Sequence, residues 1–206
     1  MPGVTRREIG GNRRLATRGE PVYGEPTGGG WRAWDTARSK LGAMLDRGMR
    51  VGLEPGIGTL YLGAAAGTTA SHVADVARVV YAVEFAPRPA RDLVEVAADR
   101  PALVPLLKDA REPETYAHVV ESGLDLLVQD VATRGQAEVA LDNRRFLAPD
   151  GRLALAIKAR SEDATAPPED VFRSTLSTLR EGYEILDRNR LDPAHDAHLG
   201  VVATPR

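Results

Sequence analysis

The 206-residue chain contains no cysteine, few aromatic residues and very little lysine. Without cysteine it cannot form disulfides, thiolate nucleophiles or cysteine-ligated zinc sites. No hydrophobic run approaches the roughly 20 apolar residues that a membrane-spanning helix needs. Residues 1–14 carry charges but no apolar segment, unlike a secretory signal. We therefore expect a cytoplasmic protein with no membrane contact.

Lysine is scarce although the chain carries 27 basic residues. The lysines are Lys40, Lys108 and Lys158, and all other basic residues are arginines. A GC-rich genome explains this excess of arginine, because most surface lysines can be replaced at little cost. A lysine that remains is a candidate for a position where arginine cannot serve, since lysine can release its proton and arginine cannot.

Positive charge is concentrated near the N-terminus. Residues 1–50 carry ten basic and five acidic residues, although the whole chain has a formal net charge of −2. A basic N-terminal segment followed by a net acidic remainder permits contact with phosphates. An independent RNA-binding protein, however, is usually more basic overall. If RNA is the substrate, we expect a partner to supply much of the affinity.

Apolar runs of strand length alternate with helical stretches from residue 59 onward. This alternation predicts a parallel sheet covered on both faces, because strands that are apolar throughout are buried on both sides. The expected strands are 59–62, 79–85, 103–107, 124–129 and 152–157, the last preceded by a turn at 149–151. The expected helices between them are 69–77, 89–98, 113–121 and 136–147.

A helix at 169–181 and two strands at 184–187 and 199–203 complete the pattern. The order predicts an α/β, doubly wound, Rossmann-like sheet of the S-adenosylmethionine-dependent methyltransferase type. Residues 1–50 are expected to form a small β-rich region that ends in a helix at 35–45. Residues 51–206 are expected to form the methyltransferase domain.

Small residues at 63–67 connect the first strand of this series to its helix. Such a loop lets the backbone approach a ligand closely. Glu84 ends the next strand, 21 residues after Gly63, where an acid can bind the two ribose hydroxyls of an adenosine cofactor. Asp109 and Asp130 end the third and fourth strands. The loop lacks the Gly-x-Gly-x-x-Gly pattern of dinucleotide sites, so these acids favour S-adenosylmethionine.

Several segments resemble the archaeal fibrillarin-like proteins. The most specific are the loop 62–73 and the following segment 81–88, and the similarity extends from about Tyr23 to the end of the chain. Further matching segments are 34–41, 91–93, 108–111, 129–132 and 157–159.

The resemblance implies an activity and a set of partners. Fibrillarin-like proteins transfer a methyl group from S-adenosylmethionine to ribose 2′-hydroxyls of rRNA and, in archaea, tRNA. They act within box C/D ribonucleoproteins. A guide RNA selects the nucleotide, a Nop-domain scaffold protein docks the enzyme, and a kink-turn-binding ribosomal-type protein organises the RNA.

The resemblance also implies a set of cofactor-binding residues. Glu84 would hold the ribose hydroxyls, Phe85 would pack on adenine, and Asp109 would bind the adenine amino group. The family usually has glutamine at the position of Thr133. The complete expected set is Thr68, Thr69, Glu84, Phe85, Asp109, Ala110, Asp130, Val131, Ala132 and Thr133.

The family's catalytic set corresponds here to Lys40, Asp130, Lys158 and His198. A ribose hydroxyl attacks better when a base accepts its proton, and Lys158 is the expected base. Asp130 would orient a lysine, while Lys40 and His198 would position the ribose and a neighbouring phosphate. The family commonly places aspartate directly before the site histidine, whereas here Asp196 lies two positions before His198. His195 therefore stays open as the alternative site histidine. We expect no metal, since no further ligands accompany the two histidines.

Two other interpretations remain open. The same cofactor fold can methylate a small molecule or a protein side chain, but such a pocket is often aromatic and this chain is only 5% aromatic. A non-catalytic ribonucleoprotein component is the other alternative, which the presence of Lys40, Asp130 and Lys158 disfavours. Lys108 is expected to lie on the surface without a catalytic role.

Overall fold

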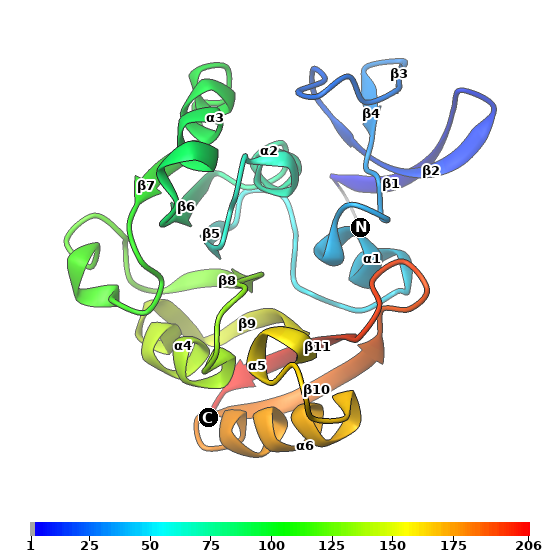
Figure 1. The fold of residues 1–206 in the computed structure, drawn as a ribbon. Helices are drawn as coiled ribbons and strands as arrows, with labels where there is room; N and C mark the ends of the chain where they lie inside the picture. Colours follow the sequence, from blue (N-terminus) through cyan, green and yellow to red (C-terminus); the bar gives the residue numbers. More distant parts are fainter. Residues whose placement is uncertain (1–2) are drawn as a thin grey trace.

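Two sheets form the framework of the computed structural model, which describes residues 3–206 (Figure 1). The smaller sheet is antiparallel, with the strand order β1-β2-β4-β3. Gly10 and Gly11 form the tight turn between β1 and β2, and both adopt positive φ, which glycine does without steric cost. The four strands are β1 (Val4–Ile9), β2 (Asn12–Arg18), β3 (Thr27–Gly28) and β4 (Trp31–Ala33).

The larger sheet has seven strands in the order β10-β11-β9-β8-β5-β6-β7. Neighbours from β9 to β7 are parallel, whereas β11 pairs antiparallel with both β9 and β10. The strands are β5 (Gly58–Leu62), β6 (Val79–Glu84), β7 (Leu103–Leu107), β8 (Leu124–Gln129), β9 (Leu147–Lys158), β10 (Tyr183–Arg190) and β11 (His198–Pro205).

Helices cover both faces of this sheet (Figure 1). In β5, Tyr61 packs into the hydrophobic cluster that includes α1, α2 and α3, whereas Leu60 and Leu62 pack into the cluster beneath α4 and α6. The doubly wound prediction is therefore confirmed. The helices are α1 (Lys40–Asp46), α2 (Thr68–Ala74), α3 (Pro87–Ala98), α4 (Gln136–Asn143), α5 (Ala159–Glu162) and α6 (Pro168–Leu179). No helix within residues 3–206 has both the length and the apolar character to cross a lipid bilayer.

The prediction of a helix at 113–121 is wrong. Only one 3₁₀ turn forms, η1 (Pro113–Thr115), and Tyr116 leaves helical geometry at φ −130°. This change of direction buries the Tyr116 ring against Phe146, with ring centroids 5.8 Å apart, and lets its hydroxyl donate to Asn143 Oδ1 at 2.6 Å. Burial of the aromatic ring outweighs the weak local preference for helix.

Other boundaries also differ from the sequence pattern. The first helix begins at Lys40 rather than residue 35, because the Ser39 hydroxyl caps it by accepting from Gly42 N at 3.0 Å. The predicted helix 136–147 ends at Asn143 and continues as the 3₁₀ turn η2 (Arg144–Phe146). The expected turn at 149–151 lies within β9, where the pairing with β8 shifts register.

A buried arginine connects the small sheet to helix α2, which packs on the large sheet. Arg32 of β4 has no exposed side-chain surface, and its Nε lies 2.8 Å from Asp75 Oδ2, just after α2. A second nitrogen lies 3.2 Å from Glu25 Oε1, and a third donates to Ser71 Oγ at 3.1 Å. Burial and nearby positive charge lower the pKa of His72 on the same helix to about 2, so its ring packs in the neutral form.

Removing the Arg32 guanidinium should destabilise the protein strongly. We expect Arg32→Met to lose about 3–5 kcal/mol of unfolding free energy, because Asp75 and Glu25 would stay buried without their main partner. Urea denaturation followed by circular dichroism measures this loss. The matched control is Arg6→Met, because the Arg6–Asp46 pair is largely exposed and should contribute no more than about 1 kcal/mol. Equal, small losses in both variants would contradict the structural role of Arg32.

Candidate active site

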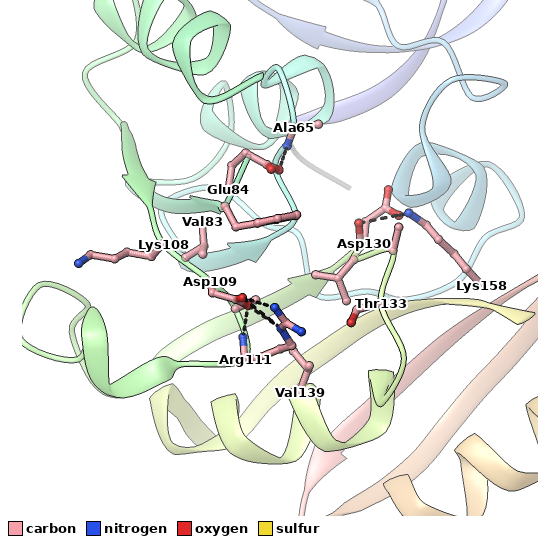
Figure 2. A pocket seen from close by; sticks show the side chains of 15 residues that line it. Ala65, Val83, Glu84, Lys108, Asp109, Arg111, Asp130, Thr133, Val139 and Lys158 are labelled. Atoms are coloured by element: carbon pink, nitrogen blue, oxygen red, sulfur yellow. Dashed lines mark hydrogen bonds and ion pairs between the residues drawn. The ribbon is translucent and has the colours of Figure 1, made fainter. Parts of the chain in front are cut away.

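A cavity of about 350 Å³ lies at the carboxyl ends of the central parallel strands (Figure 2). It brings together the loop after β5 and the residues that follow β6, β7 and β8, which is where open α/β sheets bind ligands. Its lining residues are Gly63, Ala65, Val83, Glu84, Phe85, Lys108, Asp109, Ala110, Arg111, Asp130, Val131, Ala132, Thr133, Val139 and Lys158.

The loop after β5 makes a close turn that requires glycine. Gly63 has φ +80°, and a Cβ there would lie 2.5 Å from the backbone oxygen of Asp130. Ala65 also adopts positive φ, at 49°, which is uncommon for a residue with a side chain. Its amide donates to Glu84 Oε2 at 2.9 Å, so the loop and the end of β6 hold each other in place.

Glu84 is buried, and its carboxylate is fixed at the edge of the cavity. Oε1 accepts a second backbone hydrogen bond from Ala86 N at 2.8 Å. A carboxylate oxygen can accept more than one hydrogen bond, so both oxygens remain able to bind hydroxyl groups. Phe85 follows directly with 68% of its surface exposed, which leaves most of an aromatic ring open to solvent at the cavity mouth.

Asp109 lies at the far wall of the cavity beside Arg111 (Figure 2). Arg111 donates to it through its backbone nitrogen at 2.9 Å and through its guanidinium, with Nη2 2.5 Å from Oδ2. This guanidinium hydrogen bond lowers the pKa of Asp109 below its ordinary value. Arg111 was missed by sequence reasoning, although it lies only two residues after Asp109.

Most of the expected cofactor residues line this cavity, but two do not. Ala110, Val131, Ala132 and Thr133 belong to its walls. Thr68 instead borders a second hollow near Trp34, and Thr69 is buried, with its hydroxyl donating to Ser39 Oγ at 3.0 Å. Lys108 belongs to the rim, but its ammonium points away from Asp109 and Asp130 in Figure 2.

Asp130 lies between two lysine ammonium groups that come from distant parts of the sequence. Lys40 Nζ, on α1, lies 3.2 Å from Asp130 Oδ2. Lys158 Nζ, at the end of β9, lies 3.0 Å from Oδ1 of the same carboxylate. The three side chains are only 20%, 16% and 17% exposed for Lys40, Lys158 and Asp130 respectively, so water screens their charges weakly. Two positive charges therefore share one negative charge at the cavity edge.

Gln136 holds the backbone on both sides of this ion pair. Its side chain accepts from Lys158 N at 2.9 Å and donates to Lys158 O at 3.1 Å. Its backbone oxygen accepts from Gln129 Nε2 at 2.7 Å, and Gln129 directly precedes Asp130. Glu162 accepts from the first backbone nitrogens of this helix region, Gly135 N at 2.9 Å and Gln136 N at 2.5 Å. The positions of Lys158 and Asp130 are therefore coupled through two buried residues, Gln136 and Gln129.

The two candidate histidines are neighbours, with ring centroids 6.0 Å apart, but they make different contacts. His198 pairs with Lys158 in the β11–β9 ladder, and its Nδ1 lies 2.6 Å from Asp196 O. His195 directs Nε2 to the backbone oxygen of Thr36 at 2.9 Å. Burial, followed by the charges of Lys40 and Lys158, lowers the pKa of His198. Within residues 3–206, no cluster of three or more acidic or histidine side chains is arranged as a metal site.

The strand order, the glycine turn after β5 and the acids at the ends of β6 and β8 define an S-adenosylmethionine-dependent methyltransferase fold. The family model described as Fibrillarin matches residues 4–206. The chain belongs to the fibrillarin family.

Individual relatives agree with this assignment. The chain is 70% identical over 204 residues to a fibrillarin-like rRNA/tRNA 2′-O-methyltransferase of Halorubrum lacusprofundi, which covers 99% of this chain and 96% of the relative. It is 37% identical to the fibrillarin of a crystallised fibrillarin/Nop5p complex, with a TM-score of 0.92 and coverage of 99% and 98%. It is 43% identical to Aeropyrum pernix fibrillarin with natively bound S-adenosyl-L-methionine, with a TM-score of 0.86 and coverage of 98% and 94%.

The pKa of His198 should report the charges around it. Lys40→Met removes a nearby positive charge and should raise this pKa, whereas Asp130→Asn removes a negative charge and should lower it further. NMR titration of the His198 ring protons measures both shifts, with the ring signals of His118 as an internal control. Shifts of the same sign in the two variants would contradict the electrostatic arrangement.

Proposed function

We propose that this protein transfers a methyl group from S-adenosylmethionine to the 2′-hydroxyl of ribose in rRNA and tRNA, within a guide-RNA-directed box C/D ribonucleoprotein. The observation that carries the proposal is the Asp130 carboxylate held between Lys40 and Lys158 at the edge of the cavity. The names of the related proteins, including rRNA/tRNA 2′-O-methyltransferase, support it.

The cavity offers groups that suit each part of S-adenosylmethionine. The Glu84 carboxylate accepts the two ribose hydroxyls, and the exposed Phe85 ring covers the adenine. Asp109, beside Ala110, accepts a hydrogen bond from the adenine amino group. Val131, Ala132 and Thr133 flank the methionine part together with Asp130, whereas Thr68 and Thr69 lie outside the cavity and are left out of the proposed contacts. The cofactor supplies a methyl group on a sulfonium, and the negative charge of Asp130 favours that cation nearby.

Lys158 is the proposed base. The reaction is an in-line displacement in which the ribose oxygen attacks the methyl carbon and loses its proton. Lys158 then accepts the 2′-hydroxyl proton. Asp130 orients its nitrogen, and Lys40 and His198 position the ribose and a neighbouring phosphate.

The partners follow from the same family relationship. A solved complex pairs a similar fibrillarin with Nop5p, which supports a Nop-domain scaffold protein as the docking partner. We extend this to a box C/D guide RNA and a kink-turn-binding ribosomal-type protein. The net charge of −2 gives the isolated chain little general attraction for RNA, so substrate delivery by an assembly is consistent with its electrostatics.

Methyl transfer should therefore require assembly. Transfer of tritiated methyl groups to a target RNA would be measured with the isolated protein and with particles containing scaffold, kink-turn protein and guide. We expect activity only in the complete particle, at the nucleotide that the guide selects. Equal rates for free and assembled protein would rule out guide-dependent action.

Glu84→Ala should weaken S-adenosylmethionine binding by about 1.5–3 kcal/mol, because it removes a charged acceptor for the ribose. Isothermal titration calorimetry measures this affinity. Glu84→Gln keeps the shape and one acceptor oxygen, so it should lose less. If Glu84→Ala folds and binds with unchanged affinity, Glu84 does not contact the cofactor.

Lys158→Arg should separate a base from a simple positive charge. Arginine keeps the charge but cannot accept a proton, so we expect the rate to fall roughly 10²–10⁴-fold. Single-turnover kinetics on assembled particles measures the chemical step without product release. Lys108→Arg is the matched control, because its ammonium points away from the site. A Lys158→Arg rate within about threefold of wild type would exclude Lys158 as the base.

A further inference from the structure

The N-terminal sheet carries positive charge that the cavity does not use. Arg6 and Arg32 have carboxylate partners. Among residues 3–206, Arg7, Arg14 and Arg18 form no ion pair with an acidic side chain. These three arginines come from β1 and β2 and lie near one another in the small sheet.

Trp31 lies among these charges. The guanidinium carbon of Arg7 lies 4.7 Å from the centre of its ring, and that of Arg18 lies 4.8 Å away. Arg18 and Trp31 are direct partners in the β2–β4 ladder, and the indole remains partly exposed. The indole holds two guanidinium groups in place by cation–π contact, and these groups offer hydrogen-bond donors for phosphate.

Arg7 and Arg14 face each other directly across β1 and β2. Like charges at such positions destabilise a sheet, and no described carboxylate pairs with either of them. An anionic ligand would relieve this repulsion. Guanidinium groups suit phosphate, because their planar donors can form two parallel hydrogen bonds to it.

Arg14 also connects the sheet to the catalytic lysines. With Arg38 and Ser39 it lines a hollow of about 150 Å³, and its Nε is buried without a hydrogen-bond partner among the described residues. Two carboxylates in the hollow are already bonded: Glu25 to Arg32 and to backbone nitrogens, and Asp35 to Ala37 N at 2.9 Å. Ser39 directly precedes Lys40, so this hollow adjoins the helix that carries one of the two lysines of the site.

We propose that Arg7, Arg14, Arg18, Trp31 and Arg38, which we call the arginine face, bind the phosphodiester backbone of RNA in the assembly. The exposed part of the Trp31 indole, which supports the Arg7 and Arg18 guanidiniums, lies beside the bound nucleotide. The proposal rests on the proposed function, because it assumes an RNA substrate delivered to Lys40 and Lys158. An acidic partner protein is the competing occupant, and the planar donors of four guanidinium groups favour phosphate over it.

Charge removal tests the location of this face. Anisotropy titrations of a short fluorescein-labelled RNA duplex would compare the full-length wild type with Arg7→Ala/Arg18→Ala over a series of KCl concentrations. Loss of two phosphate contacts should weaken binding about tenfold near 0.1 M salt. It should also reduce the slope of log K against log [KCl] by about 1 for each arginine. Circular dichroism at each salt concentration verifies folding.

The matched control removes the same charge elsewhere. Arg180→Ala/Arg188→Ala takes two exposed arginines from the groove between α6 and β10, which Figure 1 places away from the small sheet. This variant should bind the duplex like wild type. Equal losses in both double variants, or no loss in either, would overturn the proposal.

Tryptophan emission gives an independent readout. The chain has two tryptophans, and Trp34 is buried, so emission changes on RNA binding should come from Trp31. We expect quenching in wild type and markedly less in Trp31→Phe. Quenching of equal size in the two proteins would contradict RNA contact with Trp31.

Two further measurements separate this proposal from the proposed function. Calorimetry with S-adenosylmethionine should give the same affinity for Arg7→Ala/Arg18→Ala and wild type. Single-turnover methyl transfer in the particle should require about tenfold more target RNA for half-maximal rate in this variant. Wild-type particles without methyl transfer would reject the proposed function, whereas an active variant with unchanged RNA dependence would reject the arginine face alone. If the variant loses affinity for the scaffold protein without RNA, the face binds protein instead.

Discussion

The shared ion pair of Asp130 is the interaction on which the site depends. Its carboxylate lies within 3.2 Å of Lys40 and 3.0 Å of Lys158, which belong to the N-terminal helix and to the end of β9. The small sheet, the central sheet and the C-terminal strands must all be correctly placed for these three groups to meet. This requirement explains why the N-terminal region is anchored by a fully buried arginine rather than by a flexible linker.

The surrounding polar groups fix this geometry through the backbone. Gln136 bonds both backbone groups of Lys158 and receives the Gln129 side chain, so small movements of β8 and β9 are coupled. Gly63 lets the loop after β5 pass directly against the Asp130 carbonyl. A methyl donor bound against this loop and a ribose held by the lysines would meet with little freedom, which is how alignment accelerates a displacement reaction.

The sequence predicted features that depend on periodicity or on strand ends. Buried runs such as 124–129 marked the parallel strands, and Glu84, Asp109 and Asp130 followed from their positions at strand ends. Features set by long-range packing were missed. Tyr116 breaks the expected helix because its ring is buried against Phe146, and Gln136 reaches Lys158 across a separation that no local pattern records. The roles assigned to the catalytic residues stay predictions.

Replacement of Asp130 tests the central claim most directly, namely that one carboxylate organises both lysines for ribose methylation. Single-turnover methyl transfer would be measured in particles assembled with Asp130→Asn, which keeps the side-chain shape but removes its charge. We expect a rate at least roughly 100-fold lower, because neither lysine would be held or electrostatically balanced. A folded variant that methylates the guided nucleotide within about threefold of the wild-type rate would contradict it.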